Sequence, residues 1–278
     1  MAIITISRGS YSRGKEVAEA LADRLGYECV SRDILLETCE EFAIPEIRLI
    51  KALHDAPSVL DRFSHGRERY ISYFRAAFLN HMAKDNIIYH GLSGHFFLKG
   101  IAHTAKVRII GKMEDRIKEE MKRENSSADE ARYLLKKDDD ERRKWAMSLY
   151  GMDTSNSSLY DLVLRIDVMT IDDVVGILEK IIKDGLFDAT PESTEMIKKQ
   201  ALLANIHANI VSVSPRATVD IKDGIVTLRN LDSTLKYDED FRQKTAKRLI
   251  ETYNLKDVVF AKSVKAKNDH INPFYNLS

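Results

Sequence analysis

The sequence predicts an α/β protein built on a mostly parallel sheet, followed by a small α+β domain. Short apolar runs alternate with longer amphipathic stretches over the first two thirds of the chain, which is typical of a parallel sheet covered by helices. After residue 190 the order changes to helix, strand, strand, helix, strand. Because 278 residues are enough for two domains, we expect one domain over residues 1–188 and a second over residues 191–278.

The elements of the first domain follow from its hydrophobic pattern. Its strands are short and rich in β-branched residues, whereas its helices carry apolar residues at three-to-four spacing. The expected strands cover residues 2–6, 28–31, 86–89, 107–110 and 161–166. The first expected helix follows Gly14, a second begins near Arg32, and residues 44–84 are expected to be mostly helical. Three more helices are expected over residues 113–123, from the Ser126–Ser127 cap to Tyr150, and over 171–182.

The second domain is predicted from a capped helix and a hairpin. Thr190 is an N-cap residue, and Pro191 follows at the first helical position. Two β-rich runs meet at Asp223–Gly224, a dipeptide that favours a tight hairpin turn. The expected strands cover residues 217–221, 225–228 and 258–260, with a helix over 241–253 before the last of them.

Composition excludes several classes of protein. Hydrophobic residues make up 44% of the chain, and 43 basic residues balance 43 acidic ones, which argues against a general binder of nucleic acids or membranes. Two cysteines, Cys29 and Cys39, are too few for a disulfide framework and lack metal-site spacing. The start lacks the pattern of a signal peptide, and no apolar run is long enough for a transmembrane helix. We therefore expect a cytoplasmic protein with reduced thiols.

The most informative motif is a G-x-x-x-x-G-K spacing, from Gly9 to Lys15, between the first strand and the first helix. Backbone N–H groups of such a loop wrap phosphates, and the lysine neutralises their charge. Glu16 stands where a Ser or Thr usually binds Mg²⁺, so its carboxylate either holds the metal or repels the γ-phosphate. The alternative is a basic strand-to-helix turn in another kind of α/β protein. The expected nucleotide-binding residues are Ser12, Arg13, Gly14, Lys15, Glu16 and Val17.

Several stretches together resemble the cytidylate kinase-like family of P-loop kinases, over about residues 1–185. Residues 4–18 are similar to the family's opening strand and phosphate loop, in which a basic residue followed by Glu is usual. Residues 25–35 resemble its second strand and substrate-side helix, 139–151 its lid, and 159–167 its closing strand. The resemblance implies a P-loop kinase fold with a helical lid. It also implies Mg²⁺-dependent transfer of the ATP γ-phosphoryl to a nucleoside monophosphate, CMP or dCMP.

The resemblance also implies roles for individual residues. Lys15 would hold the β- and γ-phosphates, and Arg142 of the lid would close over the transition state with support from Arg143. On the acceptor side, the implied residues are Arg32, Asp33, Arg75 and His90. Each of these residues also has a purely structural interpretation. The lid arginines could lie on a solvated helix face, Arg75 could cover apolar surface with the aliphatic part of its side chain, and His90 could be a structural histidine.

The chain departs from the family after its third strand. The family carries Gly-Arg-Gly there, with the arginine on a substrate phosphate, whereas this chain has Leu92 between Gly91 and Ser93. We expect an arginine introduced at Leu92 to raise the affinity for the acceptor. No acidic residue ends that strand to hold Mg²⁺ in the usual way. Two alternatives therefore stay open: a catalytically weak, nucleotide-binding regulatory protein, and a P-loop kinase of another small acceptor.

Residues 192–267 weakly resemble a BON domain, on the hallmark Val219–Leu228 around Gly224. Such domains are associated with the binding of ligands or membrane surfaces. The resemblance implies a sensor or output domain whose ligand the sequence does not name. A small packing or dimerisation domain is the alternative, and a homo-oligomer is compatible with either.

Overall fold

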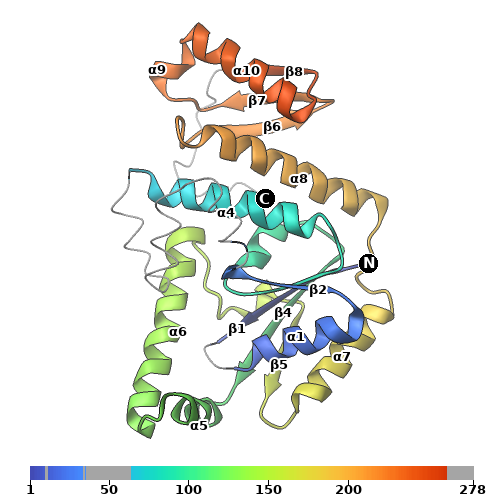
Figure 1. Cartoon of the computed structure of the whole chain (residues 1–278), viewed down its shortest axis with the longest axis vertical. Helices are drawn as coiled ribbons and strands as arrows, with labels where there is room; N and C mark the ends of the chain where they lie inside the picture. Colours follow the sequence, from blue (N-terminus) through green and yellow to red (C-terminus); the bar gives the residue numbers. More distant parts are fainter. Residues whose placement is uncertain (10–11, 34, 36–63, 262–278) are drawn as a thin grey trace.

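The computed structural model describes residues 1–9, 12–33, 35 and 64–261, and it confirms an α/β fold (Figure 1). Its larger sheet has the order β2-β3-β1-β4-β5, and every neighbouring pair in it is parallel. These strands are β1 (Ile3–Arg8), β2 (Glu28–Ser31), β3 (Ile87–His90), β4 (Thr104–Gly111) and β5 (Leu162–Ile166). The helix expected near Arg32, and the helical region expected before residue 64, lie mostly outside the described residues.

Helices cover both faces of this sheet. On one face α1 (Gly14–Leu25) and α7 (Ile171–Lys183) pack on alternate residues of β1, Ile4 and Ile6 among them. On the other face α4 (Gly66–Met82) and the short 3₁₀ helix η2 (Gly94–Leu98) build an aromatic core that contains Phe74 and Phe78. The period-two alternation of β1 thus divides the core into two layers.

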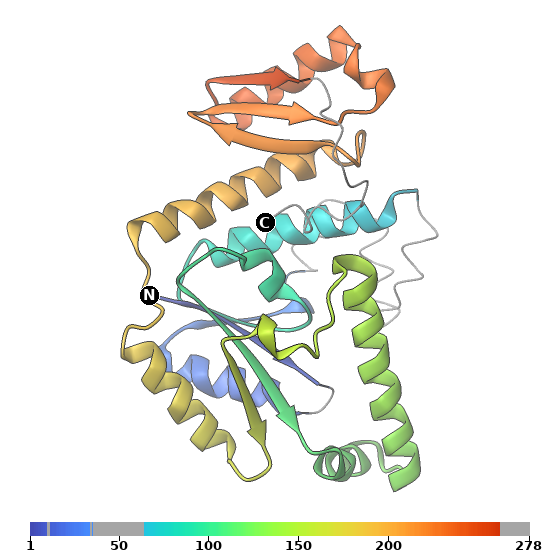
Figure 2. The same ribbon diagram turned by 180° about the vertical axis from the view of Figure 1, so that it is seen from behind.

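Two helices pack on each other beyond β4, and we call them the lid helices because the second contains most of the segment expected as the lid, residues 139–151. The helix α5 (Met113–Glu124) follows β4, and α6 (Ala128–Tyr150) begins at a capping box between Ser127 and Glu130. Figures 1 and 2 show α5 beyond the end of the sheet and α6 running back from it toward α4. Only the last turns of α6 enter the main core, through Trp145 and Tyr150. Its first half packs on α5 in a small cluster of Ile117, Ala131 and Leu135.

The C-terminal region has the predicted element order with one short helix added. Its sheet is β6-β7-β8, antiparallel at the first pair and parallel at the second. Asp223 and Gly224 both have positive φ, as the hairpin turn requires. The elements are α8 (Pro191–Ile210), β6 (Thr218–Lys222), β7 (Ile225–Arg229), α9 (Ser233–Lys236), α10 (Glu239–Tyr253) and β8 (Asp257–Phe260).

The helix α8 packs on both parts of the molecule. Ala201 and Ala204 on one face join the aromatic core around α4, whereas Ile206 and Ile210 join the core of the small sheet. Across the α4–α8 contact, the side-chain amides of Asn80 and Asn205 exchange two hydrogen bonds of 2.9 and 2.7 Å. The alanines of α8 leave room for α4 to pack against it. Because α8 contributes to both cores, it connects the small sheet to the larger fold.

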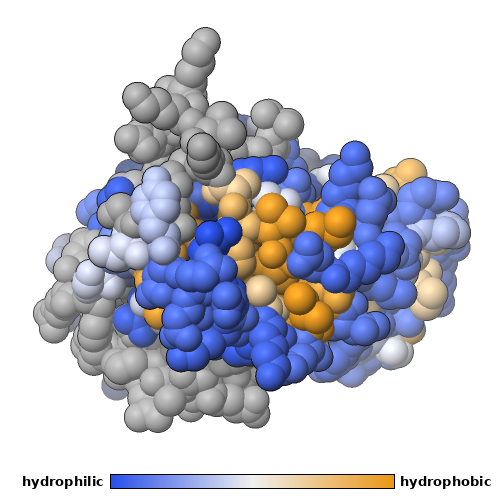
Figure 3. Space-filling view, turned by 90° about the horizontal axis from the view of Figure 1, so that it is seen from above, coloured by the Kyte–Doolittle hydropathy of each residue, from blue (hydrophilic) through white to orange (hydrophobic). Residues whose placement is uncertain are grey.

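Ile225 and Val259 are the large hydrophobic residues exposed on the face of the small sheet that points away from its helices. Figure 3, seen from above, shows hydrophobic side chains gathered at the end of the molecule that carries the small sheet, and hydrophilic side chains surround them.

In the described part of the chain, none of the helices is both long and apolar enough to cross a membrane.

Candidate nucleotide-binding site

The loop between β1 and α1 is tied to the neighbouring strand. Ser12 is buried, and its hydroxyl donates to the carbonyl oxygens of Gly9 (3.0 Å) and Ile109 (3.1 Å). Arg13 follows with a φ of 59° and serves as the N-cap of α1. The Ser12 side chain therefore fixes the loop to β4, and the ligand-binding capacity of this segment lies in its backbone and in the residues that follow.

Gly14 is required by close packing. A Cβ added there would lie 2.9 Å from the Cβ of Arg8, a distance that would force the strand and helix apart. The next side chain, Lys15, is 55% exposed, and its ammonium lies 3.6 Å from Glu19. Such an exposed pair contributes little, so an anion at the helix N-terminus competes for Lys15 easily. Val17, by contrast, is a core residue whose N–H bonds the carbonyl of Arg13.

A cavity of about 530 Å³ opens beside the loop, and we call it the phosphate cavity. Its cationic residues come from β1, from the loop and from both lid helices. Six cationic side chains and two carboxylates line it, and two of the cations, Lys15 and Arg123, also form ion pairs with carboxylates outside the lining. The lining residues are Arg8, Arg13, Lys15, Glu16, Glu119, Lys122, Arg123 and Arg142.

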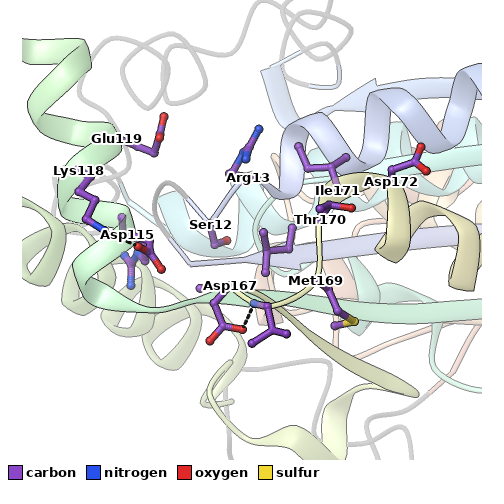
Figure 4. Close-up of a pocket in the computed structure, with 14 residues that line it drawn as sticks. Ser12, Arg13, Asp115, Lys118, Glu119, Asp167, Met169, Thr170, Ile171 and Asp172 are labelled. Carbon is purple, nitrogen blue, oxygen red and sulfur yellow. Dashed lines mark hydrogen bonds and ion pairs between the residues drawn. The ribbon is translucent and has the colours of Figure 1, made fainter.

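A second cavity of about 570 Å³ meets the first at Arg13, and we call it the nucleoside cavity. Figure 4 shows it between the start of α1, the lid helix α5 and the loop from β5 to α7. Its wall is partly apolar, through Ile166, Val168, Met169 and Ile171. A flat apolar group such as a nucleobase suits this wall, while the neighbouring cavity suits phosphates.

Asp167 anchors the wall of the nucleoside cavity to the lid. Its carboxylate lies 3.0 Å from the ammonium of Lys112, which precedes α5, and 2.9 Å from the guanidinium of Arg165. It also accepts the N–H of Val168 at 2.6 Å, drawn as the dashed line in Figure 4. Burial acts to raise the pKa of Asp167, but the bonds from Lys112, Val168 and Arg165 hold it below its usual range.

The two lid arginines differ in position. Arg142 lines the phosphate cavity, as the sequence predicts for a residue that closes over the phosphates. Arg143 lies at an exposed position and pairs with Asp140 at 3.1 Å. Arg142 is therefore the lid arginine that the structure brings to the loop.

On the acceptor side, Arg32 is held by aromatic neighbours. Its guanidinium lies 5.2 Å from the ring centroid of Trp145 and donates to the hydroxyl of Tyr70 at 3.2 Å. A Cβ added at Gly91 would meet the Cβ of Arg32 at 3.3 Å, so Arg32 stands beside the turn after β3. Asp33 next to it is exposed. The backbone of Arg32 is thus close to the turn after β3, while its guanidinium is directed to Trp145 and Tyr70.

His90 and Arg75 line neither cavity. His90 ends β3, and burial, with smaller contributions from Arg8 and Lys15, lowers its pKa and so favours the neutral imidazole. Arg75 lies on α4 close to His207 of α8, and burial lowers its pKa to about 10. His90 therefore stands near the phosphate loop, whereas Arg75 lies at the α4–α8 contact.

Leu92 is 7% exposed and belongs to the aromatic core. An arginine there would bury its stem and charge among apolar groups, so we now expect Leu92→Arg to lower the free energy of unfolding by about 3 kcal/mol. Urea denaturation measures this change. A variant as stable as the parent, with tighter binding of the acceptor, would restore the expectation drawn from the sequence.

Several site residues escaped the sequence analysis. Lys122 and Arg123 lie one turn after Glu119 on α5, and this spacing places them on one helix face. Arg8 directly precedes the loop. Among the described residues, no group of three or more His, Cys, Asp or Glu is arranged to hold a metal ion. Glu16 and Glu119 are the carboxylates that line the phosphate cavity, and they fit a metal that arrives with its phosphates.

A profile of the cytidylate kinase-like family matches residues 3–168, well over half of the chain. The chain belongs to the cytidylate kinase-like family. Its fold is similar to that of an uncharacterized protein from Eubacterium ventriosum, at 20% identity and a TM-score of 0.51, over 66% of this chain and 99% of that one. A shikimate kinase from Bacteroides thetaiotaomicron is more distant, at 11% identity and a TM-score of 0.41, over 66% and 98% of the two chains. Among curated proteins none matches the chain.

The family match covers every residue that lines the phosphate cavity, both lid helices, and the nucleoside cavity as far as Val168. Its last matched residue, Val168, lies in the wall of the nucleoside cavity, and its first, Ile3, begins the strand that leads into the phosphate loop. The small C-terminal sheet lies beyond the match.

Proposed function

We propose that this protein transfers the γ-phosphoryl group of ATP to a nucleoside monophosphate, with CMP or dCMP as the favoured acceptor. The observation that carries the proposal is the phosphate cavity, in which cations from β1, the loop, α1 and both lid helices converge beside the G-x-x-x-x-G-K segment. Such a cluster of cations favours a reaction in which both donor and acceptor are anionic. A nucleoside monophosphate meets that requirement.

The chain's own residues would act mainly by charge and position. Lys15 and Arg13 bind the donor phosphates from the loop, and Arg142 approaches from the lid. Phosphoryl transfer spreads charge over the oxygens of the moving group, and cations aimed at those oxygens stabilise the transition state. Glu16 and Glu119, the carboxylates that line the phosphate cavity, would hold Mg²⁺, and the metal would supply positive charge to the phosphates. Closure of the lid excludes water that would otherwise hydrolyse ATP.

Arg32 would hold the phosphate of the acceptor. Its contacts with Trp145 and Tyr70 fix the guanidinium, and its Cβ lies beside Gly91 in the turn that follows β3. A preoriented guanidinium loses little conformational entropy when it forms two hydrogen bonds to a phosphate. Asp33, exposed beside it, is placed to accept hydrogen bonds from a sugar hydroxyl or a base amino group.

A coupled assay of ADP production tests the proposed function. The protein is mixed with ATP, Mg²⁺ and one acceptor at a time: CMP, dCMP, UMP, AMP, GMP, or shikimate as a non-nucleotide acceptor. Saturable ADP production with CMP or dCMP supports the proposal. Turnover with shikimate alone favours a kinase of another small acceptor, and binding of ATP without acceptor-dependent turnover favours a regulatory protein.

Replacing Arg32 by Ala should raise the KM for the nucleoside monophosphate by about 30-fold, because one bidentate contact to a charged group contributes about 2 kcal/mol. The KM for ATP should stay within about twofold, since Arg32 lines neither cavity. Initial-rate kinetics with each substrate varied in turn separate the two effects. Arg229→Ala on the small sheet is the matched control. Equal changes in both KM values would contradict an acceptor role.

The C-terminal region supports a second proposal, that a BON-like domain senses a ligand and acts on the kinase part. The supporting observation is α8, which belongs to the cores of both parts. A ligand that shifts α8 would therefore also shift α4, and through α4 the acceptor side of the sheet. Assays of the intact protein with vesicles of phosphatidylglycerol test this idea through a change in acceptor KM.

A further inference from the structure

The lid carries a carboxylate beside the nucleotide site that the proposed reaction does not use. Asp139 of α6 accepts a hydrogen bond from Arg116 of α5, with 2.8 Å between Oδ2 and Nη2. The side chain of Arg116 is 10% exposed and that of Asp139 is 34% exposed. This partly buried ion pair joins the two lid helices to each other.

The same ion pair rests against the phosphate loop. A Cβ added at Gly9 would meet Oδ1 of Asp139 at 3.6 Å and Nη1 of Arg116 at 3.7 Å. Gly9 is the first glycine of the G-x-x-x-x-G-K spacing, and Arg116 also lines the nucleoside cavity. An anionic group and its guanidinium therefore stand at the point where the loop leaves β1.

We propose that Asp139 is a placeholder for the donor phosphates, and this inference rests on the proposed function. In the nucleotide-free protein Asp139 neutralises Arg116, and on binding a phosphate oxygen takes the place of its carboxylate. Carboxylate and phosphate oxygens form the same charge-assisted hydrogen bonds with a guanidinium, so the two compete directly for Arg116. Asp139 is thus a positioning residue, which acts on the nucleotide through Arg116.

The exchange has a consequence for the lid. Arg116 lies on α5 and Asp139 on α6, so a phosphate that takes Arg116 also removes one tie between the two helices. Breaking this ion pair costs free energy, and that cost lowers the apparent affinity of the protein for nucleotide. The placeholder therefore keeps Arg116 oriented in the empty site at the expense of affinity.

Isothermal titration with ADP, and separately with inorganic pyrophosphate, tests the inference. Asp139→Asn should bind both ligands about tenfold more tightly than the parent, because the Asp139 carboxylate no longer competes for Arg116. The matched control is Asp140→Asn, which removes the same charge from an exposed neighbour that pairs with Arg143. It should leave both affinities within about twofold.

A second pair of variants isolates the role of the arginine. Arg116→Ala should weaken ADP binding, and adding Asp139→Asn to it should tighten binding by clearly less than tenfold, because only the repulsion between Asp139 and the phosphates is then relieved. Equal or weaker ADP binding by Asp139→Asn, with an unchanged melting temperature, would overturn the inference, as would a tightening that is as large without Arg116 as with it. If the parent protein itself binds neither ADP nor pyrophosphate, the proposed function fails, and the inference fails with it.

Discussion

Replacing Lys15 by Ala should abolish phosphoryl transfer, with kcat/KM reduced by at least about a thousandfold, and should weaken ATP binding. Lys15 stands at the first turn of α1 and lines the phosphate cavity, where its charge meets the transferring group. A cation aimed at charge that develops in the transition state is worth about 4 kcal/mol in a site closed to water. Initial rates with ATP and CMP, together with titration of ATP, measure the two effects.

The folded state should be little affected by that change. Lys15 is 55% exposed and makes an exposed pair with Glu19, so its removal should change the free energy of unfolding by less than about 0.5 kcal/mol. Lys180→Ala is the matched control, because Lys180 forms the same kind of i,i+4 pair with Asp184 on α7, away from both cavities. ATP affinity equal in Lys15→Ala and Lys180→Ala would remove the loop from the proposed mechanism.

The large sheet and its order of elements were predictable because the relevant signals are local. Each strand is a short β-branched run between turns, and β2 begins and ends at the residues predicted for it. The 3₁₀ helices η2 and η3 (Ser157–Leu159) and the helix α9 were missed, since three to five residues are too few to show a helical period.

The site was predictable only where one motif contains it. The spacing of Gly14 and Lys15 identifies the loop, but the contribution of Lys122 depends on how α5 folds back over that loop. For Arg75 the sequence gives a less definite signal, and its role toward the acceptor stays a prediction. It lies on a helix packed between the sheet and α8, and a helix buried on two sides has no single polar face to indicate where a cation points.

Acidification should destabilise the protein between about pH 6.5 and pH 4, because two buried histidines stay neutral in the folded state. His207 lies between α8 and α4, with Nδ1 2.7 Å from the hydroxyl of Ser72, and burial, followed by Arg75, lowers its pKa to about 4. For His95 in η2, burial, followed by Lys106 and Arg108, lowers the pKa to about 3. Unfolding releases both imidazoles to a pKa near 6.5, where they take up protons.

The sign and size of the change in stability follow from the difference in proton uptake between the folded and unfolded states. Above pH 6.5 neither state binds the proton, and the stability contributed by neutral His207 is fully present; as the pH falls toward 4, only the unfolded state is protonated, which removes about 3 kcal/mol. That is a large part of a typical free energy of unfolding. Urea denaturation at pH 7.5 and pH 5 should show the loss, and His207→Gln, whose amide can still bond Ser72, should reduce it by about 2 kcal/mol. An equal loss in parent and variant would mean that the pKa of His207 is not lowered in the folded protein, and the prediction would be wrong.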